Sequence, residues 1–80
     1  MANRTRSSER LDRSELADRL HALADEFEHE DGDVDVLVGN KRVTLAPGDR
    51  IDYEIEVTER ASRLRKSREA IDIELRWKSG

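Results

Sequence analysis

The densest group of side chains able to bind an anion lies in residues 60–68, where five of nine residues are basic. They are Arg60, Arg63, Arg65, Lys66 and Arg68. Basic side chains that neutralise phosphates release counterions, so this segment is a candidate contact for nucleic acid or for an acidic partner. It has no interleaved aromatic residue to stack on bases, and the whole chain carries a net charge of −4. We therefore favour a solvated loop and keep nucleic-acid binding as the alternative.

An acidic run over residues 25–35 is the second such group, because closely spaced carboxylates bind divalent cations. Asp31, Asp33 and Asp35 have the spacing that begins a calcium-binding loop. The sixth position of that loop is Val36 instead of glycine, and the twelfth is Arg42 instead of glutamate. We expect a solvated helix end and turn here, and no metal site.

Residues that support catalysis are scarce. The two histidines, His21 and His29, have no third histidine and no cysteine to complete a zinc site. The serines lie in polar, mostly arginine-flanked contexts, without a nucleophile elbow or a glycine-rich phosphate loop. We predict no catalytic residue, no cofactor and no enzymatic activity.

Length and composition limit the class of protein. Eighty residues suffice for one domain with a modest core. Charged residues make up 42% of the chain, yet Leu, Ile, Val and Phe number 18 and the net charge is small, so we expect a folded domain. Twelve arginines against three lysines, with 19 acidic residues, are typical of a halophilic, salt-adapted protein. The sequence has neither an apolar secretion signal nor a stretch of ~20 apolar residues, so we expect a cytoplasmic protein without a membrane partner.

A polar, flexible arm over residues 1–10 is predicted to precede a single domain over residues 11–78. Asp12 and Glu15 have the spacing of a capping box, which starts a helix. Apolar residues then recur every three or four positions, at Leu16, Leu20, Leu23, Ala24 and Phe27. This period predicts an amphipathic helix over residues 13–29.

The hydrophobic period changes to two after residue 33, which is typical of half-buried strands. A two-residue turn at Gly39-Asn40 would pair Val36 with Val43 and Val34 with Leu45, placing all four on one face. A slip of one residue would send Val43 and Leu45 to the other face. Turn length and alternation therefore predict the same hairpin.

Two further strands are predicted after the turn at Pro47-Gly48-Asp49, over residues 51–58 and 71–78. Their core-facing residues are Ile51, Tyr53, Ile55 and Val57, then Ile71, Ile73, Leu75 and Trp77. A basic loop over residues 59–70 is inserted before the last strand. The predicted fold class is α+β, with one amino-terminal amphipathic helix packed on a four-stranded antiparallel meander sheet.

The helix segment 17–27, the alternating strands and the ending Ile71-Asp72-Ile73-Glu74-Leu75-Arg76-Trp77 resemble the amphi-Trp domain, a family of short prokaryotic proteins frequent in haloarchaea. The resemblance covers residues 10–78 and is one of pattern. It implies the same small α+β architecture and brings no activity with it. The longer basic connection before the last strand departs from the family pattern.

The predicted pairing of the last two strands sets like charges opposite each other. With Tyr53 opposite Leu75, Glu54 faces Glu74 and Glu56 faces Asp72, which destabilises a sheet. High salt or a basic surface of a second copy would offset this repulsion. We therefore expect a non-enzymatic structural or protein-interaction domain that forms a homo-oligomer, most simply a dimer. Pairing of exposed edge strands between copies is another route to self-association.

Overall fold

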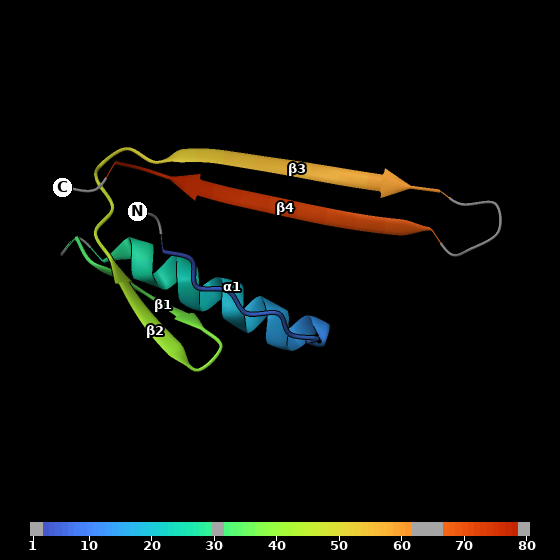
Figure 1. Ribbon diagram of the computed structural model, residues 1–80, viewed down its shortest axis with the longest axis horizontal. Coiled ribbons are helices and arrows are strands. Elements are labelled where there is room, and N and C mark those ends of the chain that lie inside the picture. The colour runs from blue at the N-terminus through green and yellow to red at the C-terminus, as the bar shows by residue number, and fades with distance from the viewer. Residues whose placement is uncertain (1–2, 30–31, 62–66, 79–80) are drawn as a thin grey trace. The chain divides into compact units, whose positions relative to one another are not determined.

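The computed structural model contains one helix and four strands among the residues that it describes, 3–29, 32–61 and 67–78. They are α1 (Arg13–Glu28), β1 (Val34–Val38), β2 (Lys41–Leu45), β3 (Asp52–Arg60) and β4 (Arg68–Arg76) (Figure 1). These elements form two units, one ending at Pro47 and the other beginning at Gly48. The predicted α+β class is confirmed.

Helix α1 begins with the predicted capping box. The backbone N–H of Glu15 donates to Asp12 Oδ1 at 2.8 Å, and the N–H of Asp12 donates to Glu15 Oε1 at 3.4 Å. Both bonds satisfy N–H groups that have no partner inside the helix. The helix ends at Glu28 and His29 is its C-cap, so the prediction of residues 13–29 is confirmed to within one residue.

The β1–β2 hairpin has the predicted turn and register. Val36 pairs with Val43 and Val34 with Leu45, and Gly39 takes a φ of +61° at the first central position of the turn. Only glycine adopts this angle at no steric cost, so the sequence places the turn here. Helix α1 lies beside this hairpin within the same unit (Figure 1).

The β3–β4 hairpin is longer than β1–β2 and also has the predicted register. Tyr53 pairs with Leu75, and the ladder continues to Arg60 opposite Arg68. The strands therefore extend into the segment 59–70 that was predicted as a loop, and both segment ends, 59–60 and 68–70, are strand.

The predicted single four-stranded sheet is corrected to two two-stranded sheets. In the described residues β1 pairs with β2 and β3 pairs with β4, and β2 does not pair with β3. A two-residue turn fixes β1–β2 locally, whereas six residues that include Pro47 separate β2 from β3. Proline has no N–H to donate to a ladder, and alternation shows which face is apolar without showing which strands are neighbours.

Few apolar side chains are buried among the residues that the structure describes. Val34, with 2% of its surface exposed, is the one buried apolar residue among those that the structure describes. Leu16 and Leu20 of the helix stripe are 48% and 51% exposed, and Tyr53, predicted as core, is 63% exposed. Trp77 is half-buried. Among the described residues no helix is both long enough and apolar enough to cross a membrane.

Candidate interaction surface

One side of the β3–β4 hairpin carries a continuous apolar surface, called here the apolar hairpin face. It consists of Tyr53, Ile55, Val57, Ile71, Ile73 and Leu75. Tyr53 pairs with Leu75, Ile55 with Ile73 and Val57 with Ile71, so the six side chains form three adjacent cross-strand pairs. All but the half-buried Leu75 are between 50% and 67% exposed. A patch of adjacent, exposed apolar side chains is typical of a surface that contacts a protein, a membrane or a ligand, so this face is a candidate interaction surface.

Glutamates limit the apolar hairpin face at one end. Glu59 and Glu69 pair across the strands, and they follow Val57 and precede Ile71 by two residues, which places them on the same face. Both are exposed. The face therefore has three apolar rows followed by one acidic row.

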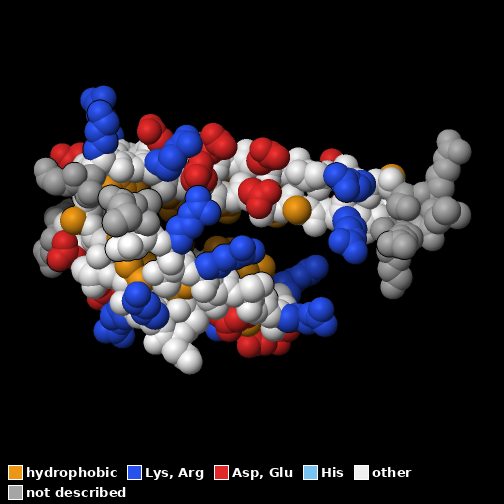
Figure 2. All heavy atoms as spheres, viewed as in Figure 1, with side chains coloured by type: hydrophobic (Ala, Val, Ile, Leu, Met, Phe, Trp, Pro, Cys, Tyr) orange, Lys and Arg blue, Asp and Glu red, His pale blue; other side chains and the backbone are white. Residues whose placement is uncertain are grey.

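The opposite side of the same hairpin, the acidic hairpin face, has the predicted like-charge pairs, Glu54 with Glu74 and Glu56 with Asp72. Arg76 lies between the first two: Nη1 is 3.0 Å from Glu74 Oε1, and Nη2 is 3.5 Å from Glu54 Oε1. Figure 2 shows acidic side chains gathered over the middle of this hairpin. One arginine of the same chain thus offsets the first repulsion, whereas no ion pair within the described residues offsets the second.

The sequence reasoning missed this role of Arg76, although the signal was available. The register that pairs Asp52 with Arg76 puts Arg76 two residues beyond Glu74 on the same strand, and therefore on the same face. It is also the diagonal neighbour of Glu54, a distance that a long side chain spans.

The predicted basic contact site is described only in part. Arg60 and Arg68 are direct cross-strand partners, both are exposed, and they line a shallow hollow of about 300 Å³. Figure 2 shows basic side chains toward this end of the hairpin. Arg63, Arg65 and Lys66 lie outside the described residues. The structure thus brings together two of the five residues.

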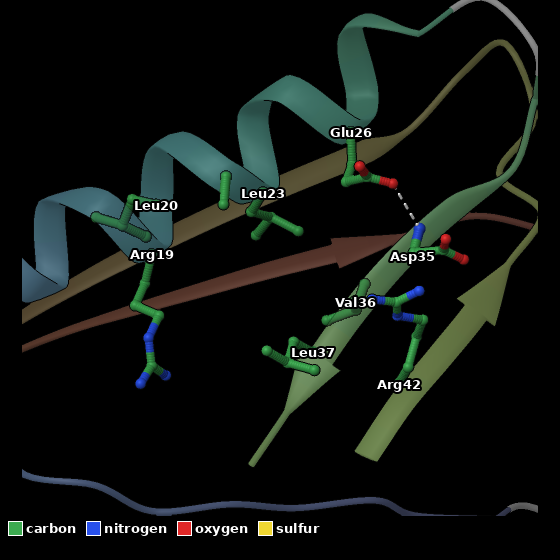
Figure 3. A pocket seen from close by; sticks show the side chains of 9 residues that line it. Arg19, Leu20, Leu23, Glu26, Asp35, Val36, Leu37 and Arg42 are labelled. Carbon is green, nitrogen blue, oxygen red and sulfur yellow. Dashed lines mark hydrogen bonds between the residues drawn. The ribbon is translucent and has the colours of Figure 1, made fainter. Parts of the chain in front are cut away.

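A second hollow, of about 540 Å³, lies between α1 and the β1–β2 hairpin (Figure 3). Leu20 and Leu23 of the helix face Val36 and Leu37 of β1 across it. At its end the N–H of Asp35 donates to Glu26 Oε1 at 2.9 Å, which ties β1 to the last turn of α1. Glu26 in this hollow therefore serves to join the helix to the hairpin.

The segment before α1 is held by an ion pair within the first unit. Arg19 Nη1 and Nη2 donate to the two carboxylate oxygens of Glu9 at 2.8 and 3.1 Å. This bidentate hydrogen bond, and then the charge of the guanidinium, lower the pKa of Glu9 below its usual value. The same contact raises the pKa of Arg19. Ser7 lies close to the turn, since a Cβ on Gly39 would be 3.1 Å from Ser7 Oγ.

Over residues 3–29, 32–61 and 67–78, no three His, Asp or Glu side chains come close enough to hold a metal ion. In the same ranges no buried side-chain nitrogen or oxygen lacks a hydrogen-bond partner. The structural feature that remains to be explained is therefore the apolar hairpin face.

Comparison with known proteins gives a family and no further relative. The family model of the Amphi-Trp domain matches residues 1–80, the whole chain. No curated protein and no solved structure matches the chain. The match agrees with the amphipathic helix, the alternating strands and the tryptophan after β4, and on this evidence the chain belongs to the Amphi-Trp domain family.

Proposed function

We propose that this chain is a non-enzymatic structural or protein-interaction domain, and that its contact surface is the apolar hairpin face. The observation that carries the proposal is that five of its adjacent apolar side chains are at least half exposed. An isolated two-stranded hairpin is marginally stable in water, and it becomes stable when its apolar face is covered. The domain therefore associates with other protein chains, its own copies included.

The size of the exposed surface supports the proposal. Completing the burial of a half-exposed Val, Ile or Tyr side chain stabilises by roughly 1 kcal/mol. Five such side chains contribute about 5 kcal/mol, which is comparable to the whole stability of a small domain. A partner that covers the face thus stabilises this domain substantially.

The charges around the apolar hairpin face support a specific contact over aggregation. Glu59 and Glu69 limit the face at one end, and the other side of the hairpin carries two like-charge acidic pairs. Charges beside an apolar strand suppress uncontrolled edge-to-edge pairing. The surface is therefore suited to a partner that matches its apolar rows and keeps its own acidic groups away from this acidic row.

Cysteine labelling tests whether the face is open, because the chain contains no cysteine of its own. The variant Ile55→Cys places a thiol on the apolar hairpin face. Glu54→Cys is the matched control, one residue away on the opposite face, where the Glu54 side chain is 59% exposed. At high dilution the two thiols should react with a maleimide at rates within a few-fold of each other. Excess unlabelled wild-type protein should slow the reaction of Ile55→Cys alone.

The opposite result would end the proposal. If the thiol of Ile55→Cys is protected about a hundredfold more than that of Glu54→Cys at every dilution, the face is sealed within its own chain. Circular dichroism of both variants must show the helix signal of the wild type, so that unfolding is not mistaken for exposure.

Nucleic-acid binding is the second candidate function, and the Arg60–Arg68 pair favours it. Two arginines directly opposite each other repel, and a bound phosphate removes that repulsion. The variant with Gln at positions 60, 63, 65, 66 and 68 should lose binding to a single-stranded oligonucleotide at low salt. Arg4→Gln with Arg6→Gln serves as a control for charge outside this segment. Absence of binding by the wild type at 20 mM salt, about a 20 Å screening length, would exclude this function.

A further inference from the structure

We propose that the partner of the apolar hairpin face is the same face of a second copy, with strand directions reversed, so that β3 lies over β3 and β4 over β4. This inference rests on the proposed function and names its partner. The two copies are related by a two-fold axis that lies between the packed faces and runs perpendicular to the strands. Such an interface uses the same patch on both subunits.

The apolar hairpin face is a series of cross-strand rows with an acidic row at one end. The four rows are Tyr53–Leu75, Ile55–Ile73, Val57–Ile71 and Glu59–Glu69, in sequence along the strands. Successive rows are about 7 Å apart, because side chains on one face recur at every second residue. The pattern is asymmetric, since the acidic row occurs at one end only.

Two two-fold arrangements bring all four rows of both faces into contact. In the first, each row meets the same row of the other copy, so that the two Glu59–Glu69 rows meet and four carboxylates come together in an interface. Uncompensated like charges removed from water are strongly unfavourable. Charge therefore excludes this aligned arrangement.

In the second, reversed arrangement the order of the rows is inverted between copies. The Ile55–Ile73 row meets Val57–Ile71, and the Tyr53–Leu75 row meets Glu59–Glu69. The two pairs of acidic residues then lie at opposite ends of the interface. Tyr53 of one copy lies over Glu59 of the other, where its phenolic O–H can donate to the carboxylate. The interface has an apolar centre and polar ends, as protein interfaces usually do.

The area of the face sets the strength of this dimer. Five side chains that are 50–67% exposed offer an apolar area on the order of 500 Å² per copy, large for a patch on a monomer. A standard stable interface buries roughly 800 Å² per partner. The face alone therefore supports a dimer of modest affinity, which forms and dissociates with protein concentration in the micromolar range.

Crosslinking between single-cysteine variants tests the arrangement. Positions 53 and 59 are six residues apart on β3, about 20 Å. A bifunctional maleimide that spans about 10 Å therefore connects a thiol at position 53 of one copy with a thiol at position 59 of the other only where the dimer brings these two positions together. A mixture of Tyr53→Cys and Glu59→Cys should give a crosslinked heterodimer at least tenfold faster than the control mixture. The control is Asp52→Cys with Thr58→Cys, which have the same separation on the opposite face.

A second mixture, Glu59→Cys with Glu69→Cys, reports the aligned arrangement. Faster crosslinking of this mixture than of Tyr53→Cys with Glu59→Cys would overturn the reversed arrangement. If the protein is a dimer but neither mixture crosslinks faster than the control mixture, the face-to-face contact is overturned. That result would indicate pairing of strand edges.

Failure of this inference is distinguishable from failure of the proposed function. A protein that stays monomeric at all concentrations, with the thiol of Ile55→Cys openly reactive, excludes a second copy and leaves the face available to a different protein. A monomer in which that thiol is protected overturns both proposals, because the face is then covered by its own chain.

Discussion

Glu54 and Glu74 are direct cross-strand partners on β3 and β4, and the guanidinium of Arg76 contacts both carboxylates. A repulsive pair thereby becomes a three-residue network of one cation and two anions. The next pair along the same face, Glu56 with Asp72, has no such cation within the described residues. Two adjacent acidic pairs on one hairpin thus differ in their electrostatic balance, and this difference can be measured.

Replacing Arg76 should restore the repulsion between Glu54 and Glu74. We expect Arg76→Gln to lower the free energy of unfolding by about 0.5–1 kcal/mol, a modest effect because all three side chains are more than half exposed. Arg50→Gln is the control, since Arg50 is exposed and makes no ion pair within the described residues. Urea unfolding measures both variants, and an equal loss in the two would contradict the bridging role.

Removing one charge from the uncompensated pair should stabilise the hairpin. Glu56→Gln is expected to raise the free energy of unfolding by a few tenths of a kcal/mol, whereas Glu54→Gln gives no gain because it also removes a contact with Arg76. Adding 1 M NaCl should stabilise the wild type more than Glu56→Gln, since salt screens the repulsion that the variant lacks. Thermal unfolding at low and high salt tests this, and an identical salt response would be evidence against it.

The capping box should determine the stability of α1. Asp12→Ala removes the oxygen that accepts from the N–H of Glu15, and we expect a loss of about 1 kcal/mol together with reduced helix signal. Asp18→Ala, at an exposed position inside the same helix, is the control and should have little effect or a slight gain in helicity. Far-ultraviolet circular dichroism during urea unfolding distinguishes them. Equal loss in both would show that the cap is unimportant.

The ion pair of Glu9 with Arg19 predicts a dependence on pH with a definite sign. Because the folded pKa of Glu9 is lower than its unfolded pKa, its contribution to stability is present above the unfolded value. That contribution is lost as the pH falls through the lowered folded value. Carboxyl chemical shifts should show this low pKa in the wild type and the usual glutamate value in Arg19→Gln. An unchanged titration of Glu9 in the variant would contradict the contact.

The local features of this fold were predictable because short sequence signals fix them. Gly39-Asn40 sets the β1–β2 register, and alternation on β3 and β4 gives the pairing of Tyr53 with Leu75. The separation into two sheets was not predictable, because the turn residues Pro47-Gly48-Asp49 do not specify which strand becomes the next neighbour of β2. The exposure of Ile55 on the apolar hairpin face was not predictable either, since alternation identifies the side that avoids water and not what covers it.

The candidate site was predictable to a similar extent. Sequence indicated the acidic pairs and the basic segment, and the structure places Arg60 opposite Arg68 at the ends of β3 and β4. The sequence did not indicate Arg76 as the bridging cation, because that role depends on a diagonal contact between strands. Sequence placed the three apolar rows on one face, and it did not show that this face is a candidate interaction surface.

Sedimentation equilibrium of the wild type beside Ile73→Asp tests the central claim most directly. Ile73 is 50% exposed and lies in the middle of the apolar hairpin face. A carboxylate at this position would be buried if a second copy covered the face, so it disfavours the dimer. In the monomer the carboxylate stays in contact with water. The wild type should change from one chain to two as its concentration rises through the micromolar range, while Ile73→Asp stays monomeric with its helix signal intact. Equal masses for the two proteins at every concentration would contradict the claim that this face joins two copies.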